Sequence, residues 1–359
     1  MKVHDKNLVV ASKLEEKDIK FYNVKEKPFA IYGLYDKEIG KQFTRMNLEV
    51  AEKVSPGVLH CSYLTSGARI RFKTDSEYVA VVIKTEIENE DWPQMSGTAA
   101  CGLDMYELIG GKQEFVSTFI PPLYSKGKFE QIIKFIKPGM HDVTINMPIY
   151  GRVGEMYIGL QETARLEEGS KYINTLPVLF YGSSIVQGGC MSRPGMIYLN
   201  QLSRKYNIDT YNLGFGGNAK GEIEIAEYIA NHPMSIFVYD YDYNSPSEEH
   251  LEETHERMFK IVREKNPDIP VIIMSGVSGR NYEQRVRRRE IIKKTYDNAI
   301  NSGDKNVYFI DGLTVFSRYG FGWNEPTVEG CHPTDLGFTL MAAAVSEVID
   351  ENKLLERLK

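Results

Sequence analysis

The residues Val178-Leu179-Phe180-Tyr181-Gly182-Ser183-Ser184 decide the fold class of this chain. A short apolar run that ends in a Gly-Ser turn is typical of a buried strand. Similar runs follow it, and stretches with a helical period separate them. This alternation predicts a parallel sheet covered by helices on both faces. The further strands are expected at 209–214, 235–241, 270–276 and 306–312, and the helices at 222–229, 248–264, 284–299 and 336–349.

The sequence before this stretch has a different rhythm. Between about residues 20 and 160, short runs rich in Val, Ile, Tyr and Phe are broken by Gly, Pro, Asn and Asp. Examples are ARIRFKT (68–74), YVAVVIKTE (78–86) and HDVTINM (141–147). Short strands at even spacing predict an antiparallel β-sandwich or jelly roll. We therefore expect an N-terminal β-sandwich domain over 1–165, a linker over 166–176 and an α/β domain over 177–359.

Composition narrows the functional class. The 359 residues are 42% hydrophobic and 26% charged, which is typical of a soluble chain of two domains. A net charge of −6 argues against a nucleic-acid binder. A membrane-spanning helix needs about 20 apolar residues, and every apolar run in this sequence is much shorter. The first residues hold an apolar patch too short for a secretory signal, and the four cysteines form no C-x-x-C pair. We expect a reduced, cytoplasmic protein without structural zinc.

Reactive residues follow the predicted strands, where sites form in open α/β sheets. Ser183 and Ser184 follow the first strand, a glycine-rich turn (214–218) follows the second, and Asn244 follows the third. The loop after the last strand holds Glu329 three residues before His332. A hydroxyl, a histidine, a carboxylate and backbone or amide donors are the parts that acyl transfer needs.

This constellation resembles the SGNH (GDSL-type) hydrolases, and specifically two-domain esterases whose N-terminal jelly roll carries a G-x-D-L-Y motif. Here that motif reads Gly102-Leu103-Asp104-Met105-Tyr106. The blocks YGSSIVQGG, SRPGM, NLGFGGN, DYDYN and VEGCHPTDLGF follow in the family's order. The resemblance implies a flavodoxin-like, three-layer α/β/α catalytic domain preceded by a β-sandwich.

The resemblance also implies roles for individual residues. Ser184 matches the nucleophile and His332 the general base. Ser184 and Gly217, through their N–H groups, and Asn244, through its amide, match the oxyanion hole. Glu329, which stands where the family has aspartate, is the expected acid of the triad. Because its side chain is longer, two alternatives stay open: Asp335 is the competing acid, or a Ser–His dyad operates. Thr334 and Asp335 also look like the cap and first turn of the last helix.

Other residues have a functional and a structural interpretation. Arg193, Trp323 and Tyr243 are candidate substrate contacts, although salt bridging or aromatic packing explains them too. For the remaining residues the structural interpretation is favoured: a scaffold role for Asp104 and Tyr106, packing for Cys190 and Cys331, and structural or solvated positions instead of metal ligation for His250 and His255. The arginines at 285, 287, 288 and 289 are expected to form a solvated helix face.

We predict a serine esterase that hydrolyses O-acyl esters of carbohydrates, O-acetyl esters first among them, through an acyl-enzyme on Ser184. Neither a metal nor an organic cofactor is expected. The expected partner is a small-molecule or oligosaccharide ester, with no nucleic acid and no membrane, and the oligomeric state is not predicted. Alternatives are an acyltransferase with the same Ser-His machinery, a general short-chain acyl or lipid esterase, and an inactive carbohydrate-binding protein.

Overall fold

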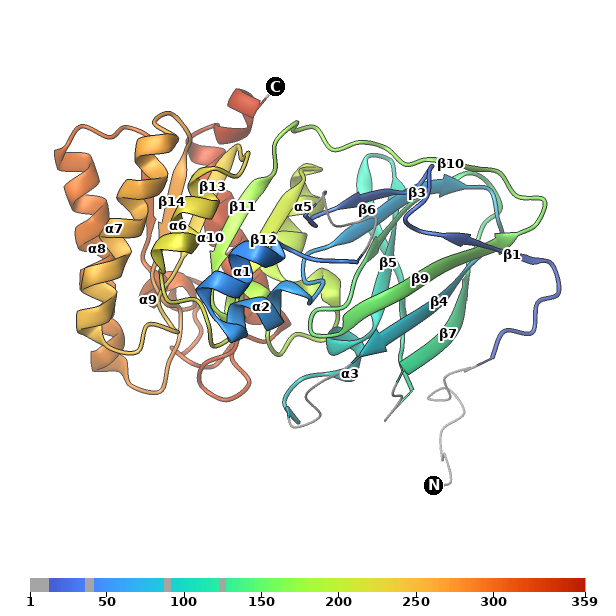
Figure 1. Ribbon diagram of the computed structural model, residues 1–359, viewed down its shortest axis with the longest axis horizontal. Coiled ribbons are helices and arrows are strands. Elements are labelled where there is room, and N and C mark those ends of the chain that lie inside the picture. Colours follow the sequence, from blue (N-terminus) through green and yellow to red (C-terminus); the bar gives the residue numbers. More distant parts are fainter. Residues whose placement is uncertain (1–12, 36–41, 87–91, 123–126, 359) are drawn as a thin grey trace.

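The computed structural model describes residues 13–35, 42–86, 92–122 and 127–358. Two lobes lie side by side, one built of β-sheets and the other of a central sheet with helices around it (Figure 1). Each lobe has its own buried apolar core. None of the helices in the described ranges is long and apolar enough to span a membrane.

The C-terminal lobe is built on a five-stranded parallel sheet. Its strands have the order β12-β11-β13-β14-β15, and nearly all their residues are buried. Because β11 pairs with both β12 and β13, the strand order reverses beside β11, and such a switch point opens a crevice at the carboxyl ends of the strands. The strands are β11 (Val178–Gly182), β12 (Thr210–Gly214), β13 (Ile236–Asp240), β14 (Val271–Met274) and β15 (Val307–Ile310).

Helices cover both faces of this sheet, which confirms the predicted three-layer α/β/α fold. Val178 and Phe180 of β11 pack in the core that includes α5 and α10, whereas Leu179 and Tyr181 pack in the core that includes α6, α7 and α8. Thr334 caps α10 as expected. The helices are α4 (Ser184–Gln187), α5 (Tyr198–Tyr206), α6 (Ile223–Ala230), α7 (Glu248–Lys265), α8 (Tyr282–Asn301), α9 (Gly312–Val315) and α10 (Asp335–Glu351), with 3-10 turns η2 (Pro194–Met196), η3 (Ser317–Tyr319) and η4 (Leu354–Leu358).

The N-terminal lobe is a sandwich of two antiparallel sheets, as predicted. One sheet has the order β1-β9-β4-β7 and the other β10-β3-β8-β5-β6, with β2 also paired to β3. A shared apolar core lies between them. The strands are β1 (Ile19–Asn23), β2 (Ala30–Tyr32), β3 (Arg69–Thr74), β4 (Tyr78–Glu86), β5 (Leu103–Ile109), β6 (Lys112–Phe119), β7 (Gly127–Lys134), β8 (His141–Asn146), β9 (Arg152–Gln161) and β10 (Leu166–Glu168), and a short helix α3 (Gly97–Ala100) precedes β5.

The structure differs from the expected domain organisation in two places. The first three residues of the expected linker form β10, which pairs with β3, so the sheet extends past residue 165. Two helices of the N-terminal half, α1 (Leu48–Val54) and α2 (Pro56–Ser62), pack in the α6–α8 core of the catalytic lobe. Fully buried Arg45 donates to the carbonyl oxygens of Asn212 (3.0 Å) and Gly214 (2.8 Å), which joins this segment to β12.

Candidate active site

Ser184 lies at the sharp turn between β11 and α4. Ser183 caps α4, because its side chain accepts the Ile185 N–H at 3.1 Å. Ser184 is therefore the first residue of the helix, where backbone N–H groups have no partner within the helix. Its side chain is almost covered, with the residue 8% exposed. The turn thus holds one hydroxyl and one backbone donor at the edge of the sheet.

His332 and Glu329 meet this hydroxyl from the loop before α10. The Ser184 Oγ lies 2.8 Å from His332 Nε2, and His332 Nδ1 lies 2.6 Å from Glu329 Oε1. Glu329 also accepts the backbone N–H of His332 at 3.1 Å, and Gly330 between them has φ +87°, a conformation that favours glycine. The longer glutamate side chain therefore reaches the imidazole by way of a tight local turn.

Asp335 is engaged elsewhere. It accepts the Ser192 N–H at 2.8 Å and the Ser192 hydroxyl, in the loop that follows the nucleophile. Of the two carboxylates considered from the sequence, the one hydrogen-bonded to the His332 ring is Glu329.

The glycine-rich turn after β12 lies beside Ser184. The Gly216 N–H donates to Gln187 Oε1 at 2.7 Å, whereas no acceptor in the described residues takes the Gly217 N–H. Gly217 has φ +73°, and a Cβ there would meet no atom within 4 Å, so this residue borders open space. Asn244 accepts the Ala219 N–H through its side-chain oxygen at 3.4 Å, which leaves its NH2 group to donate elsewhere. The Gly217 N–H and the Asn244 side-chain NH2 group are thus two donors that this part of the site can offer to a substrate oxygen.

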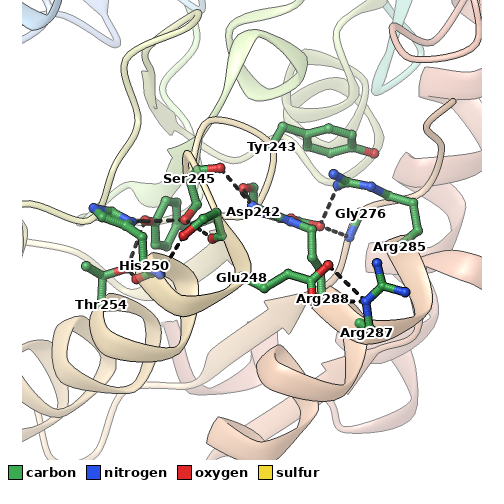
Figure 2. A network of polar contacts seen from close by, with 12 residues as sticks. Asp242, Tyr243, Ser245, Glu248, His250, Thr254, Gly276, Arg285, Arg287 and Arg288 are labelled. Carbon is green, nitrogen blue, oxygen red and sulfur yellow. Dashed lines mark hydrogen bonds and ion pairs between the residues drawn. The ribbon is translucent and has the colours of Figure 1, made fainter. Parts of the chain in front are cut away.

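The loop that carries Asn244 is anchored by a buried network (Figure 2). Asp242, 1% exposed, accepts Arg285 Nη1 at 3.0 Å, Arg288 Nε at 2.6 Å and the Gly276 N–H at 3.1 Å. The interpretation of the arginine run as a solvated face is therefore wrong for Arg285 and Arg288, which are buried. Buried cations require a partner, and Asp242 supplies it. Arg287 pairs on the surface with Glu248, and the partly exposed Arg289 pairs with Glu290 and Asp311.

Tyr243 links this loop to the histidine loop. Its Oη accepts the Ser278 N–H at 3.1 Å, and the Ser278 hydroxyl donates to the Cys331 carbonyl. The Arg285 guanidinium lies 4.9 Å from the centre of the Tyr243 ring. Burial raises the pKa of the Tyr243 phenol, so it stays protonated. These contacts give Tyr243 a scaffold position between Asn244 and His332.

Arg193 pairs with the G-x-D-x-Y motif of the β-sandwich. Its Nη1 donates to Asp104 Oδ2 at 2.9 Å and to the Tyr106 hydroxyl. Asp104, fully buried, also accepts the Gly195 N–H at 2.8 Å and Asn146 Nδ2 at 2.7 Å. The motif therefore fastens the loop after the nucleophile to the N-terminal lobe, and these contacts of Arg193 are structural.

Trp323 and His255 have structural surroundings, and Cys190 and Cys331 are protonated. Trp323 packs edge-to-face on Tyr282 at the start of α8, with ring centres 4.9 Å apart, and no described contact joins it to Ser184 or His332. Burial is the main cause that raises the pKa of the Cys190 thiol to about 12 and that of Cys331 to about 11. Both cysteines are therefore thiols at neutral pH. His255 is buried and hydrogen-bonds to Thr295.

Tyr150, a residue that sequence reasoning missed, reaches the site from the β-sandwich lobe. A Cβ built on Gly189 or on Gly216 would lie 3.5 Å from its hydroxyl, and the same Gly216 position is 3.5 Å from Ser184 Cβ. The hydroxyl is buried and has no hydrogen-bond partner among the described residues. The sequence around Tyr150, IYGR, gives no sign that this residue lies near the active site, because its position there depends on how the two lobes pack together.

Family models match both lobes. The GDSL-like lipase/acylhydrolase family matches residues 175–350, and the N-terminal G-x-D-L-Y domain of SGNH-hydrolase-type esterases matches residues 19–166. The chain belongs to the SGNH (GDSL-type) hydrolases. No curated protein is a significant sequence match to it.

Solved structures agree with this SGNH assignment. A GDSL-like lipase from Bacteroides ovatus is 27% identical, with a TM-score of 0.84 over 94% of this chain and 98% of its own. A salicylyl-acyltransferase from a tetracycline biosynthetic pathway is 19% identical, with a TM-score of 0.74 over 95% and 99% of the two chains. An acetyl xylan esterase from Butyrivibrio proteoclasticus is 13% identical, with a TM-score of 0.57 over 94% and 98%. The last two share the fold.

Proposed function

We propose that this SGNH hydrolase is a serine esterase that removes O-acetyl groups from carbohydrates through an acyl-enzyme on Ser184. The observation that carries the proposal is the continuous hydrogen-bonded chain from Ser184 Oγ through the His332 ring to Glu329. A serine next to a histidine that a carboxylate orients is the arrangement of an activated nucleophile.

The proposed reaction has two halves. His332 Nε2 takes the Ser184 proton as Oγ attacks the ester carbonyl, while Glu329 holds the Nδ1–H and stabilises the imidazolium. The N–H groups of Ser184 and Gly217 and the Asn244 amide donate to the oxyanion, and loss of one such donor typically costs about 10²–10³ in rate. His332 then protonates the departing alkoxide. Water, deprotonated by the same ring, cleaves the acyl-enzyme.

The carbohydrate substrate is supported by structural relatives. The same fold occurs in an acetyl xylan esterase and in a family two carbohydrate esterase from Clostridium thermocellum whose structure contains cellohexaose. We propose an acetylated oligosaccharide or small ester as the substrate, with no metal, organic cofactor, nucleic acid or membrane involved. We also propose a cytoplasmic location, supported by four cysteines that are all unpaired.

Acyl transfer is the second candidate function. The observation that favours it is the similarity of the whole chain to the salicylyl-acyltransferase, with a TM-score of 0.74. The first half of the reaction would be unchanged. In the second half, the hydroxyl of an acceptor would replace water at the acyl-enzyme.

The test compares two neighbouring serines. Hydrolysis of p-nitrophenyl acetate should be abolished in Ser184→Ala and largely kept in Ser183→Ala, and the reverse would refute the assignment of the nucleophile. Products from mixed acetylated plant oligosaccharides are then measured by mass spectrometry. Loss of acetyl groups that depends on Ser184 supports the esterase, and transfer of their mass to added alcohols supports the acyltransferase. If pure protein leaves every ester intact, both candidates fail and a binding protein is favoured.

A further inference from the structure

Three metal-ligating side chains meet at the base of the proposed triad. Cys190, Glu329 and His332 each place a ligand atom so that all three lie within 4.8 Å of one another. Among the described residues this is the one such group. We propose that a thiophilic divalent cation, represented by Zn²⁺, binds to these three side chains and blocks the enzyme. The metal-binding step stands on this geometry, and only the loss of activity rests on the proposed function.

The spacing fits a zinc ion after small movements. With bonds of about 2.0 Å to nitrogen and oxygen and about 2.3 Å to sulfur, tetrahedral ligands lie roughly 3.3–3.6 Å apart. Donors that are at most 4.8 Å apart must therefore approach by no more than about 1.2–1.5 Å, whereas Glu329 Oε1 and His332 Nδ1, at 2.6 Å, must separate by about 0.7–1 Å. Changes of this size are within the range of side-chain rotations.

Cys190 is held in place for this contact. It has φ +75°, a left-handed conformation uncommon for residues with a side chain, directly after the Gly188–Gly189 turn. The Gly189 N–H donates to the Ser184 carbonyl at 2.8 Å, and the Cys190 N–H points to Met95 Sδ at 3.4 Å. The turn that presents the nucleophile thus also presents the thiol to the histidine.

The donor set selects the kind of cation. A thiolate, an imidazole and a carboxylate suit Zn²⁺, whereas Mg²⁺ and Ca²⁺ prefer oxygen ligands. On binding, Cys190 releases its thiol proton to solvent, and the resulting thiolate and the Glu329 carboxylate balance the two positive charges of the ion. With three protein ligands, a fourth position remains for water.

Bound metal and catalysis exclude each other. An ion on His332 Nε2 takes the lone pair that would accept the Ser184 proton. An ion on Nδ1 requires the other tautomer of the neutral ring: the hydrogen bond to Glu329 breaks, the proton sits on Nε2, and no lone pair there can accept the Ser184 proton. In either case His332 cannot act as a base.

Calorimetric titration of Zn²⁺ into chelator-treated protein tests the binding. We expect one ion per chain for wild type, for Ser184→Ala and for the matched control Cys331→Ser. Cys190→Ser should bind at least about tenfold more weakly, since even second-shell changes cost about 10–100-fold. Mg²⁺ should not bind. Equal affinity of wild type and Cys190→Ser, or no stoichiometric binding, would overturn the site, and weakening in Cys331→Ser alone would assign it to the other cysteine. Thermal melts verify that each variant is folded.

Activity is measured separately. Zn²⁺ should inhibit p-nitrophenyl acetate hydrolysis by the wild type reversibly, with recovery on adding EDTA, and Cys190→Ser should need at least about tenfold more Zn²⁺. Tight binding without inhibition would overturn the proposed block while keeping the metal site. If the protein hydrolyses no ester, the proposed function fails, and the calorimetric result still decides whether the ion binds.

Discussion

Replacing Glu329 with glutamine removes the charge beside the His332 ring and keeps the side-chain shape. Glu329 Oε1 is 2.6 Å from Nδ1, and the side chains of His332 and Glu329 are 19% and 28% exposed. At this separation, a carboxylate and an imidazolium attract by about 3–6 kcal/mol for effective dielectric constants of roughly 20–40. Partial exposure favours the lower figure. Since about 1.4 kcal/mol corresponds to tenfold in rate, Glu329→Gln should lower kcat by roughly a hundredfold.

Steady-state hydrolysis of p-nitrophenyl acetate at neutral pH measures this loss. Asp335→Asn is the matched control, because that carboxylate binds Ser192 and should leave kcat within about threefold of wild type if it lies outside the triad. A Glu329→Gln enzyme with more than a third of the wild-type kcat would refute the triad in favour of a Ser–His dyad. A larger loss in Asp335→Asn than in Glu329→Gln would assign the acid to Asp335.

Three further changes test the surroundings of the site. Arg193→Ala leaves buried Asp104 without its cation, so the free energy of unfolding in urea should fall by about 3 kcal/mol with KM unchanged; a raised KM at unchanged stability would instead make Arg193 a substrate ligand. Tyr150→Phe removes an unpartnered buried hydroxyl, so stability should stay or rise by about 1 kcal/mol while kcat/KM falls, and lower stability would contradict this reasoning. Burial lowers the pKa of His255 to about 3, whereas the unfolded chain takes up this proton near about 6.5. Stability should therefore decline as pH falls from about 6.5 towards 3, by up to about 1.4 kcal/mol per pH unit, and His255→Gln should flatten that slope in urea titrations at pH 7 and pH 5.

Sequence alone predicted the fold class because hydrophobic period is a local property. The sequence also indicated which residues would meet in the proposed triad, because the residues that follow parallel strands lie together at the carboxyl edge of the sheet. Ser184 and His332 are 148 residues apart and still meet at 2.8 Å. The sequence favoured Glu329 over Asp335, because Thr334 and Asp335 look like a helix start, but the contact itself depends on the turn at Gly330 and on the Ser192 loop that occupies Asp335.

The buried arginines show what the local pattern misses. Arg285 and Arg288 are three residues apart, so they share one helix face, whereas Arg287 points outward. That spacing could have distinguished the two buried arginines from the exposed Arg287 on the sequence alone. Their partner Asp242 is 43 and 46 residues away, and only the packing of α8 beside the β13 loop brings the charges together. A run of like charges is therefore a poor guide to exposure when an acid follows a neighbouring strand.

The N-terminal lobe is part of the proposed active site. Arg45 holds the end of β12 just before the glycine-rich turn, the Asp104 carboxylate holds the loop after the nucleophile, and the Tyr150 hydroxyl borders Gly216 of that turn. Arg45, Asp104 and the Tyr150 hydroxyl are buried where the two halves of the chain meet, and the first two are charged groups whose hydrogen-bond partners include groups in the catalytic lobe. The β-sandwich therefore cannot be regarded as an appended binding module, because the geometry of the donors and of the nucleophile loop depends on it.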